Sequence, residues 1–376
     1  MLTLGHPESL LAIALANLGE LATERSPRMS EMRHLSIVIP SYNARALLRR
    51  TLRTLQVAAP EAEIVVVDGH SRDGSPEMVA SEFPEVILCR YENHGFAHAV
   101  NRGLEHATGE YVLLLNSDLF VSKAALDAMV GRLAADRSVA AVAPVLHNED
   151  GTRQHVFGWA FGALYWPNWL RVRNVSRVPV VNGACLMTRR DVLREIGAFD
   201  ENFFLYNEEY DWCVRAQRAG YHLELVPEPV VHVGGGSTAP SPELWLEAQR
   251  GFLYFAKKHG PPRAAELLRK AMQIEGFCYK RVDPRPRHRM MWAKLESLTK
   301  RGAYLESPFE LSGRGDVPAR PMWPGIDRRV EEAETRPSIT SADDAQHGEG
   351  ASVVRLAAER LRVAARRMPK VAGAAG

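Results

Sequence analysis

The sequence predicts an α/β fold: a mostly parallel sheet with flanking helices, followed by a helical extension and a disordered tail. Short β-branched segments alternate with segments of helical periodicity four times between residues 35 and 135. Such alternation is typical of parallel strands joined by right-handed helical crossovers. The 376 residues are 46% hydrophobic and 24% charged, which excludes a chain that is disordered throughout.

Each element of the first half follows from its local pattern. The segment Leu35–Ile39 is short, apolar and rich in β-branched residues, which favours a buried strand. Within residues 44–57, Leu48, Leu52 and Leu55 fall at helical spacing. The same two patterns predict strands at 62–67, 86–90 and 111–115, and helices at 76–83, 96–106 and 123–135.

The alternation fades after residue 136. Residues 150–180 hold three of the seven tryptophans together with Pro167 and Pro179, and we expect this region to be irregular. The remaining apolar patterns predict strands at 139–146, 183–187, 222–226 and 229–233, and helices at 189–196, within 206–219, at 242–257 and at 262–275.

Five segments are expected along the chain. Their order is an N-terminal helical extension (1–33), an α/β domain (34–240) with halves 34–135 and 136–240, a helical region (241–305), a largely disordered linker (306–350) and a basic amphipathic helix (351–376).

Composition excludes several classes of protein. Lys and Arg number 47 against 45 Asp and Glu, and a net charge of +2 does not suggest a nucleic-acid binder. The four cysteines form no CxxC pair, which argues against a zinc knuckle or disulfide scaffold and favours a reducing compartment. No apolar run is long enough for a membrane span, and residues 10–18 lack the flanks of a signal peptide. We therefore expect a cytoplasmic protein.

The basic helix expected at 351–376 has two interpretations. An apolar stripe that includes Val354, Leu361 and Met368 is surrounded by six Lys and Arg residues. Such a helix can lie on the inner face of the plasma membrane as a peripheral contact. Because much of the stripe is alanine, a solvated or self-packed helix is the alternative.

Polar, glycine-rich or acidic residues follow each of the first four strands. These loops are Pro40–Asn43, Asp68–Ser75, Asn93–Phe96 and Asn116–Asp118. In parallel sheets, ligands bind beyond the carboxyl ends of the strands.

Asp118 is a candidate ligand for Mg²⁺ or Mn²⁺, to which Asn116 could add an oxygen; capping of the helix that starts near Ser122 is the alternative. Asp68 can accept the N3–H of uracil or thymine, and an Asx turn with Ser71 is compatible with that role.

The densest cluster of candidate residues lies between Phe203 and Arg215. Glu208, Glu209 and Asp211 place three carboxylates within four residues, among five aromatic side chains. An acidic helix start with an Asp211–Arg215 pair would explain the charges alone. An acid in apolar surroundings gains basicity and can act as a general base. Further along the chain, His232 sits between a strand and three glycines, which favours a site position over a structural one.

Six ordered strings give the chain a resemblance to the family 2 glycosyltransferases of the GT-A fold, and within them to the rhamnosyltransferase-like branch. The resemblance covers residues 35–238. The strings are IVIPSYN (37–43), VVVDGHSRDGS (65–75), NHGFAHAVNRGL (93–104), LLLNSD (113–118), GAFDENFFLYNEEYDWCVR (197–215) and VVHVGGGS (230–237). It implies that 34–135 binds the nucleotide and 136–240 holds the catalytic and acceptor residues.

The resemblance also implies a role for each matched residue. Glu209 would be the general base, with Glu208 and Asp211 as further catalytic acids and Trp212 and Arg215 as supporting motif positions. Asp118 and His232 would bind the metal, Mn²⁺ or Mg²⁺. The donor nucleotide sugar would contact Pro40, Tyr42, Asn43, Asp68, Ser71, Asp73, Asn93, Gly95, Phe96, Asn101, Asn116 and Ser117.

The implied reaction is an inverting, metal-dependent transfer of a sugar, foremost L-rhamnose from dTDP-rhamnose, to a hydroxyl of a glycan or lipid-linked acceptor in bacterial cell-surface polysaccharide synthesis. Two departures from the family pattern are Asn116 in the DxD-type motif and Glu209 where Asp is usual. The alternatives are a UDP-sugar transferase (galactofuranose, hexose or N-acetylhexosamine) and an inactive nucleotide-sugar binding protein. A nucleotidyltransferase would carry a basic, glycine-rich loop after the first strand, where this chain has Pro40–Asn43.

Overall fold

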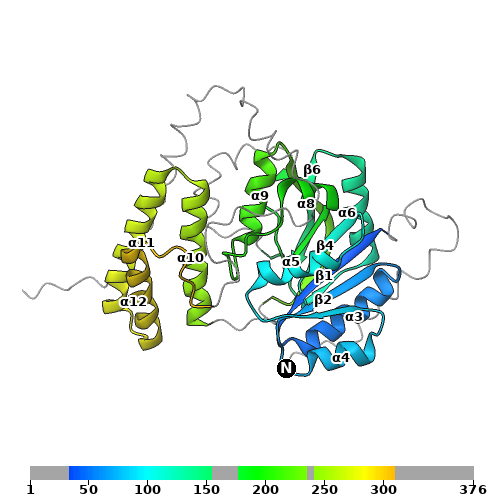
Figure 1. Ribbon diagram of the computed structural model, residues 1–376, viewed down its shortest axis with the longest axis horizontal. Helices are drawn as coiled ribbons and strands as arrows, with labels where there is room; N and C mark the ends of the chain where they lie inside the picture. Colours follow the sequence, from blue (N-terminus) through cyan, green and yellow to red (C-terminus); the bar gives the residue numbers. More distant parts are fainter. Residues whose placement is uncertain (1–33, 155–176, 235–240, 310–376) are drawn as a thin grey trace, which may run out of the picture.

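The computed structural model describes residues 34–154, 177–234 and 241–309 (Figure 1). A single sheet with helices on both faces stands beside a unit of three helices, so the predicted α/β class is confirmed. The helix expected before residue 33, most of the irregular region, the linker and the basic C-terminal helix lie outside the described residues.

The described residues form one nine-stranded sheet in the order β3-β2-β1-β4-β8-β6-β9-β5, with β7 paired to β9. Strands β3, β2, β1 and β4 are parallel neighbours, as are β6 and β9, whereas β8, β5 and β7 run antiparallel to their neighbours. The strands are β1 (Leu35–Ser41), β2 (Glu63–Asp68), β3 (Ile87–Arg90), β4 (Tyr111–Leu115), β5 (Leu119–Phe120), β6 (Val139–His147), β7 (Arg177–Val178), β8 (Cys185–Arg189) and β9 (His222–His232).

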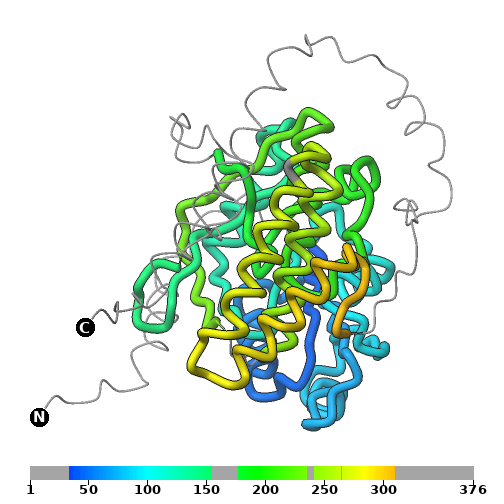
Figure 2. Tube along the Cα trace, turned by 90° about the vertical axis from the view of Figure 1, so that its left-hand side faces the viewer, coloured from blue at the N-terminus to red at the C-terminus, as the bar shows by residue number. Residues whose placement is uncertain are grey.

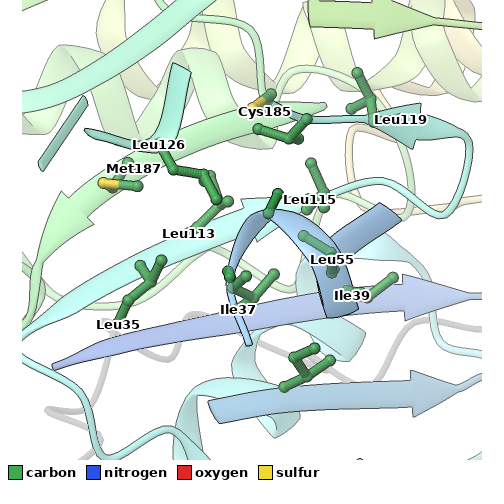
Figure 3. Close-up of a cluster of buried hydrophobic side chains, with 14 of the residues drawn as sticks. Leu35, Ile37, Ile39, Leu55, Leu113, Leu115, Leu119, Leu126, Cys185 and Met187 are labelled. Carbon is green, nitrogen blue, oxygen red and sulfur yellow. The ribbon is translucent and has the colours of Figure 1, made fainter. Parts of the chain in front are cut away.

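Alternate residues of the strands build a separate core on each face of the sheet. On one face, Ile37, Ile39 and Leu113 pack with Leu55 and Leu126 (Figure 3). The helices that cover this face are α3 (Arg45–Ala58), α4 (Ser75–Glu82) and α6 (Lys123–Ala135). Val38, Val112 and Leu114 point to the other face, because successive strand residues alternate. Its helices are α5 (Phe96–His106), α8 (Arg190–Ile196) and α9 (Glu208–Arg218).

The second half of the sheet differs from the sequence-based expectation. The strands expected at 222–226 and 229–233 are one strand, β9, which continues past its prolines because the β6–β9 register shifts between Pro144 and Val145. The short strands β5 and β7 were not predicted. Two residues are too few to carry a periodic signal, so only their pairing with β9 defines them.

Three antiparallel helices follow the sheet: α10 (Pro242–His259), α11 (Pro262–Val282) and α12 (Pro286–Arg301). They have a core of their own, in which Leu253, Leu268 and Leu295 are buried. The helix expected at 262–275 extends to residue 282, and α12 was not predicted as a separate helix. Figures 1 and 2 show α11 and α12 on the outer side of α10, away from the sheet. Among the described residues, no helix is long and apolar enough to cross a membrane.

A fully buried ion pair joins α10 to the loop before α9. Glu247 and Arg250 contact each other on α10, and Arg250 Nη2 donates to the Asn202 carbonyl at 2.7 Å. Glu247 Oε1 accepts a hydrogen bond from the Phe204 N–H at 3.1 Å. The helical unit therefore fixes the position of the loop that leads into the acidic cluster.

Candidate active site

The carboxyl ends of the parallel strands β1, β2 and β4 lie at one edge of the sheet. In the described part of the chain, the non-glycine residues with positive φ all lie in loops that the sequence motifs mark: Asn43, His70, Tyr206 and Asn207. Backbone strain of this kind persists only where surrounding structure holds it, and it clusters at functional sites. The backbone thus identifies the same edge as the motifs.

Asp68, the last residue of β2, is 1% exposed. Its Oδ2 accepts a hydrogen bond from the Ser71 N–H at 2.9 Å, which confirms the expected Asx turn. Its Oδ1 is buried and has no hydrogen-bond partner among the described residues. Arg90 Nε, at the end of β3, lies 3.9 Å from Oδ2. The turn therefore leaves one carboxylate oxygen able to accept a bond from a ligand.

Reciprocal hydrogen bonds join the loops that follow β1 and β2. Ser71 Oγ accepts from the Asn43 N–H at 2.8 Å, and Asn43 Oδ1 accepts from the Arg72 N–H at 2.8 Å. Beside them, Pro40 is half-buried and Tyr42 is exposed at the rim. Both side chains are thus at least partly accessible at the end of β1.

Asp73 serves the loop structure itself. Its carboxylate accepts hydrogen bonds from the backbone N–H of Arg45 and from Ser75, at the starts of α3 and α4. Burial raises the pKa of Asp73, but these hydrogen bonds lower it by more, so the pKa lies below its ordinary value. Both carboxylate oxygens are therefore engaged within the chain.

The start of α5 is packed tightly against the loop before α9. Gly95 has φ +101°, and a Cβ there would lie 2.2 Å from the Phe204 carbonyl oxygen. The Phe96 N–H donates to that oxygen at 2.6 Å, and Asn93 Oδ1 accepts from the Gly95 N–H at 3.2 Å. Only glycine fits this close approach. Asn101 is buried on the same helix. Its Nδ2 donates to the Phe199 carbonyl and its Oδ1 accepts from the Phe199 N–H, so Asn101 connects α5 to the segment before α9.

The segment after β4 carries a buried acid. The Asn116 N–H donates to the Ala184 carbonyl at 2.8 Å, and the carbonyl of the buried Ser117 accepts from Thr51 Oγ1 at 2.9 Å. Asp118 is 1% exposed, and neither of its carboxylate oxygens has a hydrogen-bond partner among the described residues.

The N-cap of α6 is Ser122, whose Oγ accepts from the Ala125 N–H at 3.2 Å. The alternative in which Asp118 caps this helix is therefore wrong. An ionised carboxylate is costly to bury without partners. The free oxygens of Asp118 thus require another explanation.

The short strand β5 brings His232 to Asp118. Leu119 pairs with His232 across β5 and β9, and His232 Nε2 lies 3.4 Å from Asp118 Oδ1. An imidazole nitrogen and a carboxylate oxygen at this separation can share one cation. The structure thus places side by side the two residues that the resemblance implied as metal ligands.

Gln154 holds His232 in place and was not identified from the sequence. Gln154 Nε2 donates to the His232 carbonyl at 2.8 Å and to Asn148 Oδ1 at 2.7 Å, which fixes the orientation of the amide. Its Oε1 must then accept from His232 Nδ1, 2.8 Å away. Nδ1 is thus used by Gln154, and Nε2 is the ring nitrogen on the side of Asp118. No pattern around Gln154 indicates this role, because the contact depends on strand pairing.

Glu209 and Glu208 are a pair of acids in apolar surroundings at the start of α9. Burial raises the pKa of Glu209 to about 7, against backbone hydrogen bonds that lower it. Burial and the neighbouring Glu209 raise the pKa of Glu208 well above its ordinary value. One oxygen of each has no hydrogen-bond partner among the described residues. A Cβ on Gly183 would lie 3.2 Å from Glu209 Cβ, so Gly183 leaves room for this side chain.

Asp211 has a different environment from its two neighbours. It is fully buried, and its carboxylate contacts Arg215 Nε at 2.9 Å, His259 Nε2 at 2.7 Å and Lys258 Nζ at 2.6 Å. Burial favours protonation, but these charges outweigh it and hold the pKa of Asp211 well below its usual range.

The expected Asp211–Arg215 pair is present, and it joins α9 to α10 through His259. Arg215 also donates to the Ile196 and Ala198 carbonyls. Trp212 is buried in the core and donates to the Gly197 carbonyl at 3.1 Å. These side chains hold α9 and the acids at its start in position.

Comparisons with known proteins show what the chain is similar to. Residues 36–197 match the family model described as Glycosyl transferase family 2. The chain is 26% identical over 260 residues to N-acetylglucosaminyl-diphospho-decaprenol L-rhamnosyltransferase of Mycobacterium tuberculosis, covering 60% of this chain and 85% of the relative. It is 25% identical over 199 residues to the low-salt glycan biosynthesis hexosyltransferase Agl10 of Haloferax volcanii, covering 50% of this chain and 63% of the relative.

Among solved structures, the chain is similar to a mannosyltransferase from Pyrobaculum calidifontis in complex with GDP-Man and Mn²⁺. The TM-score is 0.46 and the identity 20%, and the alignment covers 87% of each chain. The family match spans the strands β1 to β4 and their loops, which carry most of the motifs described above. The chain is a glycosyltransferase, and its residues 36–197 match the model of glycosyl transferase family 2.

Proposed function

We propose that this glycosyltransferase moves L-rhamnose from dTDP-rhamnose to a hydroxyl of a glycan or lipid-linked acceptor, with inversion and with the help of a divalent cation. The observation that carries the proposal is the pair of buried, unpartnered Asp118 oxygens facing His232, at the sheet edge that also holds Asp68. The name of the relative from Mycobacterium tuberculosis supports L-rhamnose as the transferred sugar and a lipid-linked molecule as the acceptor.

The residues at this edge fit a divalent cation. Asp118 offers two oxygens that no described residue uses, and His232 offers Nε2, because Gln154 uses Nδ1. Mn²⁺ and Mg²⁺ accept such oxygen-rich sets, and imidazole suits Mn²⁺. No group of three acids, histidines or cysteines forms a complete site in the described residues. The diphosphate of the donor would therefore have to complete the shell. The cation would neutralise charge on the departing diphosphate.

Replacing Gln154 tests how His232 is positioned. Gln154→Leu removes the side chain that accepts the hydrogen bond from His232 Nδ1, and it leaves Asp118 and His232 themselves unchanged. Partners of metal-bound histidines affect metal affinity about 10- to 100-fold. We expect Mn²⁺ affinity, measured by calorimetry, to fall about tenfold. Gln154→Glu keeps an acceptor and should retain most of the affinity; equal affinity in wild type and the Leu variant would rule out this role for Gln154.

The position of Asp68 favours a donor whose base is a pyrimidine. Its free Oδ1 lies at the end of β2, within a loop held by Ser71 and Asn43, and it can accept the N3–H of thymine or uracil. The neighbouring side chains of Pro40, Tyr42 and Asn93 would border the nucleoside and the phosphates.

The variant Asp68→Asn tests base recognition without removing the turn. The Asn oxygen can still accept from Ser71, but the amide nitrogen would then face the base as a donor. A lost hydrogen bond to a charged group corresponds to roughly a 10- to 100-fold change. We expect dTDP binding, measured by calorimetry, to weaken by at least about tenfold. Unchanged binding, or tighter binding of GDP than of dTDP and UDP by the wild type, would contradict a pyrimidine site at Asp68.

Glu209 is the best candidate for the general base. A pKa of about 7 leaves it partly ionised near neutrality and basic enough to accept a proton. The raised pKa of Glu208 favours its neutral form, and Asp211 is held by three cationic or hydrogen-bonding partners. In the reaction, the acceptor oxygen bonds to the anomeric carbon as the bond to the diphosphate oxygen breaks, and Glu209 takes the hydroxyl proton.

A donor screen tests the proposed function directly. The full chain is incubated with Mn²⁺ and dTDP-rhamnose, UDP-galactofuranose, UDP-glucose or UDP-N-acetylglucosamine, and the released nucleotide is measured with and without a lipid-linked acceptor. We expect dTDP-rhamnose to give the fastest release. Faster release from a UDP-sugar would favour the alternative UDP-sugar transferase. Release from none of the four donors would contradict the proposal.

A further inference from the structure

The outer face of α11 carries an exposed stripe in which apolar and basic residues are interleaved. Its members recur at alternating steps of four and three residues: Arg263, Leu267, Lys270, Ile274, Phe277 and Arg281. Between residues 263 and 281 these are the exposed side chains among those that the structure describes on this helix. The exposed fractions of Leu267, Ile274 and Phe277 are 42%, 49% and 47%.

The stripe is not a continuation of the helical core. Leu268 and Met272 on the opposite side of α11 are buried with residues of α10 and α12. Gly276 also faces α12, because a Cβ there would lie 2.8 Å from the Trp292 carbonyl oxygen. The inner face of α11 is therefore packed, and α11 itself lies on the side of α10 away from the sheet (Figures 1 and 2).

The connection between α11 and α12 continues the stripe. Residues 277–290 contain five Lys and Arg residues and one aspartate, in a chain whose net charge is only +2. Val282 and Met290 are large, apolar and exposed there. Asp283 is held by Arg285 at 3.0 Å, which leaves little negative charge on this surface. The connection projects from the helical unit, in yellow at the lower left of Figure 2.

We propose that the stripe and the α11–α12 connection dock on an anionic phospholipid surface. Long basic side chains that flank apolar ones can bury the apolar groups at the lipid boundary while their charges contact headgroups. Arg281 already adopts such an arrangement, with its guanidinium 3.7 Å from the centroid of the Phe277 ring. The stripe runs about 27 Å along the helix, at 1.5 Å per residue, which is long enough to lie along a bilayer.

Charge complementarity favours this occupant over a second copy of the chain or another protein. Two copies packed through the stripe would place Arg263, Lys270 and Arg281 against the same cations of the partner, at a cost in free energy. Protein interfaces gather apolar residues in a core and are depleted in Lys, whereas here cations separate the apolar residues. The flanking Glu266 is paired with Arg269 and lies 3.8 Å from Lys270. Residues 263–290 hold eight Lys and Arg against three Asp and Glu, so the surface stays positive.

Docking of α11 would hold the enzyme beside a lipid-linked acceptor, and only this consequence rests on the proposed function. The test uses the full chain and sedimentation with vesicles of phosphatidylcholine, with and without phosphatidylglycerol. We expect binding only to the anionic vesicles. Removing the three charges by Arg263→Gln, Lys270→Gln and Arg281→Gln should weaken it about 100-fold, since each basic residue near the surface contributes about 1 kcal/mol. Ile274→Ser with Phe277→Ser should weaken it as well.

A matched control separates the stripe from general charge. Arg53→Gln, Arg137→Gln and Arg177→Gln remove three exposed charges elsewhere and should leave vesicle binding unchanged. Undiminished binding of both α11 variants, equal binding to neutral vesicles, or a dimer in light scattering that the apolar variant dissociates would overturn the proposal. Binding of Mn²⁺ and dTDP, measured on the same variants, should stay at the wild-type level, so failure of the docking proposal is distinguishable from failure of the proposed donor site.

Discussion

Replacing Glu209 by Gln is expected to reduce turnover by about 100-fold or more while donor binding stays nearly intact. Loss of general acid–base help usually costs 10²- to 10⁴-fold. Gln keeps the size of the side chain, so Gly183 still accommodates it. The measurement pairs kcat, from nucleotide release, with calorimetry of dTDP and Mn²⁺. A variant with near-normal kcat would exclude Glu209 as the base.

Glu208→Gln is the matched control for this experiment. Burial and the neighbouring Glu209 raise the pKa of Glu208, which favours its neutral form, and Gln keeps that size without a charge. We therefore expect a much smaller loss of kcat than for Glu209→Gln. If the two variants ranked in the opposite order, the roles of these neighbours would have to be exchanged.

The pH dependence of kcat/KM should report the ionisation of the same residue, Glu209. A base must be ionised to accept a proton, and burial raises the pKa of Glu209 to about 7. Below that value kcat/KM should rise with pH, by about tenfold per unit, and above it the rate should level off. Because the two glutamates interact, the measured pKa belongs to the pair. The rise should disappear in Glu209→Gln and persist in Glu208→Gln.

Asp118→Asn is expected to have the second large effect, on metal-dependent binding. The change removes the negative charge and one of two acceptor oxygens without altering size. Altering partners of metal ligands already costs 10- to 100-fold in affinity, so losing a ligand should weaken Mn²⁺-dependent dTDP binding by about 100-fold or more. Calorimetry with and without Mn²⁺ measures this difference directly.

Replacing Asn116 by Asp is a control in which Mn²⁺ binding should change in the opposite direction. Asn116→Asp adds a carboxylate two residues from Asp118, and we expect it to strengthen Mn²⁺ binding severalfold, because hard cations prefer charged oxygen ligands. Both variants should retain the melting temperature of the wild type to within a few degrees. Equal dTDP binding by wild type and Asp118→Asn in the presence of Mn²⁺ would remove Asp118 from the proposed metal site.

The first half of the fold was predictable because its signals are local. β1, β2 and β4 are buried on both faces and read as apolar runs, and α3 carries leucines at helical spacing. The loops that follow these strands could be assigned to one edge, since parallel strands end together. This reasoning placed Asp68 and Asp118 correctly at the sheet edge.

The geometry of the site depends on contacts that no local pattern encodes. β5 is two residues long, yet its pairing with β9 brings Asp118 to His232. Gln154 reaches His232 from the turn after β6, at the edge of a region expected to be irregular. Burial raises the pKa of Glu209, whereas that of Asp211 is lowered by Arg215 and by His259 and Lys258, which reach it from α10. Each of these features is long-range, and periodicity carries no information about it.

A crystal soaked with Mn²⁺ and dTDP would show whether Asp118 and His232 hold the cation beside the nucleotide. We expect an anomalous Mn²⁺ peak in coordination with the Asp118 carboxylate, His232 Nε2 and the diphosphate, and thymine N3 within hydrogen-bond distance of Asp68 Oδ1. A nucleotide bound elsewhere, or a peak that contacts neither Asp118 nor His232, would contradict this arrangement.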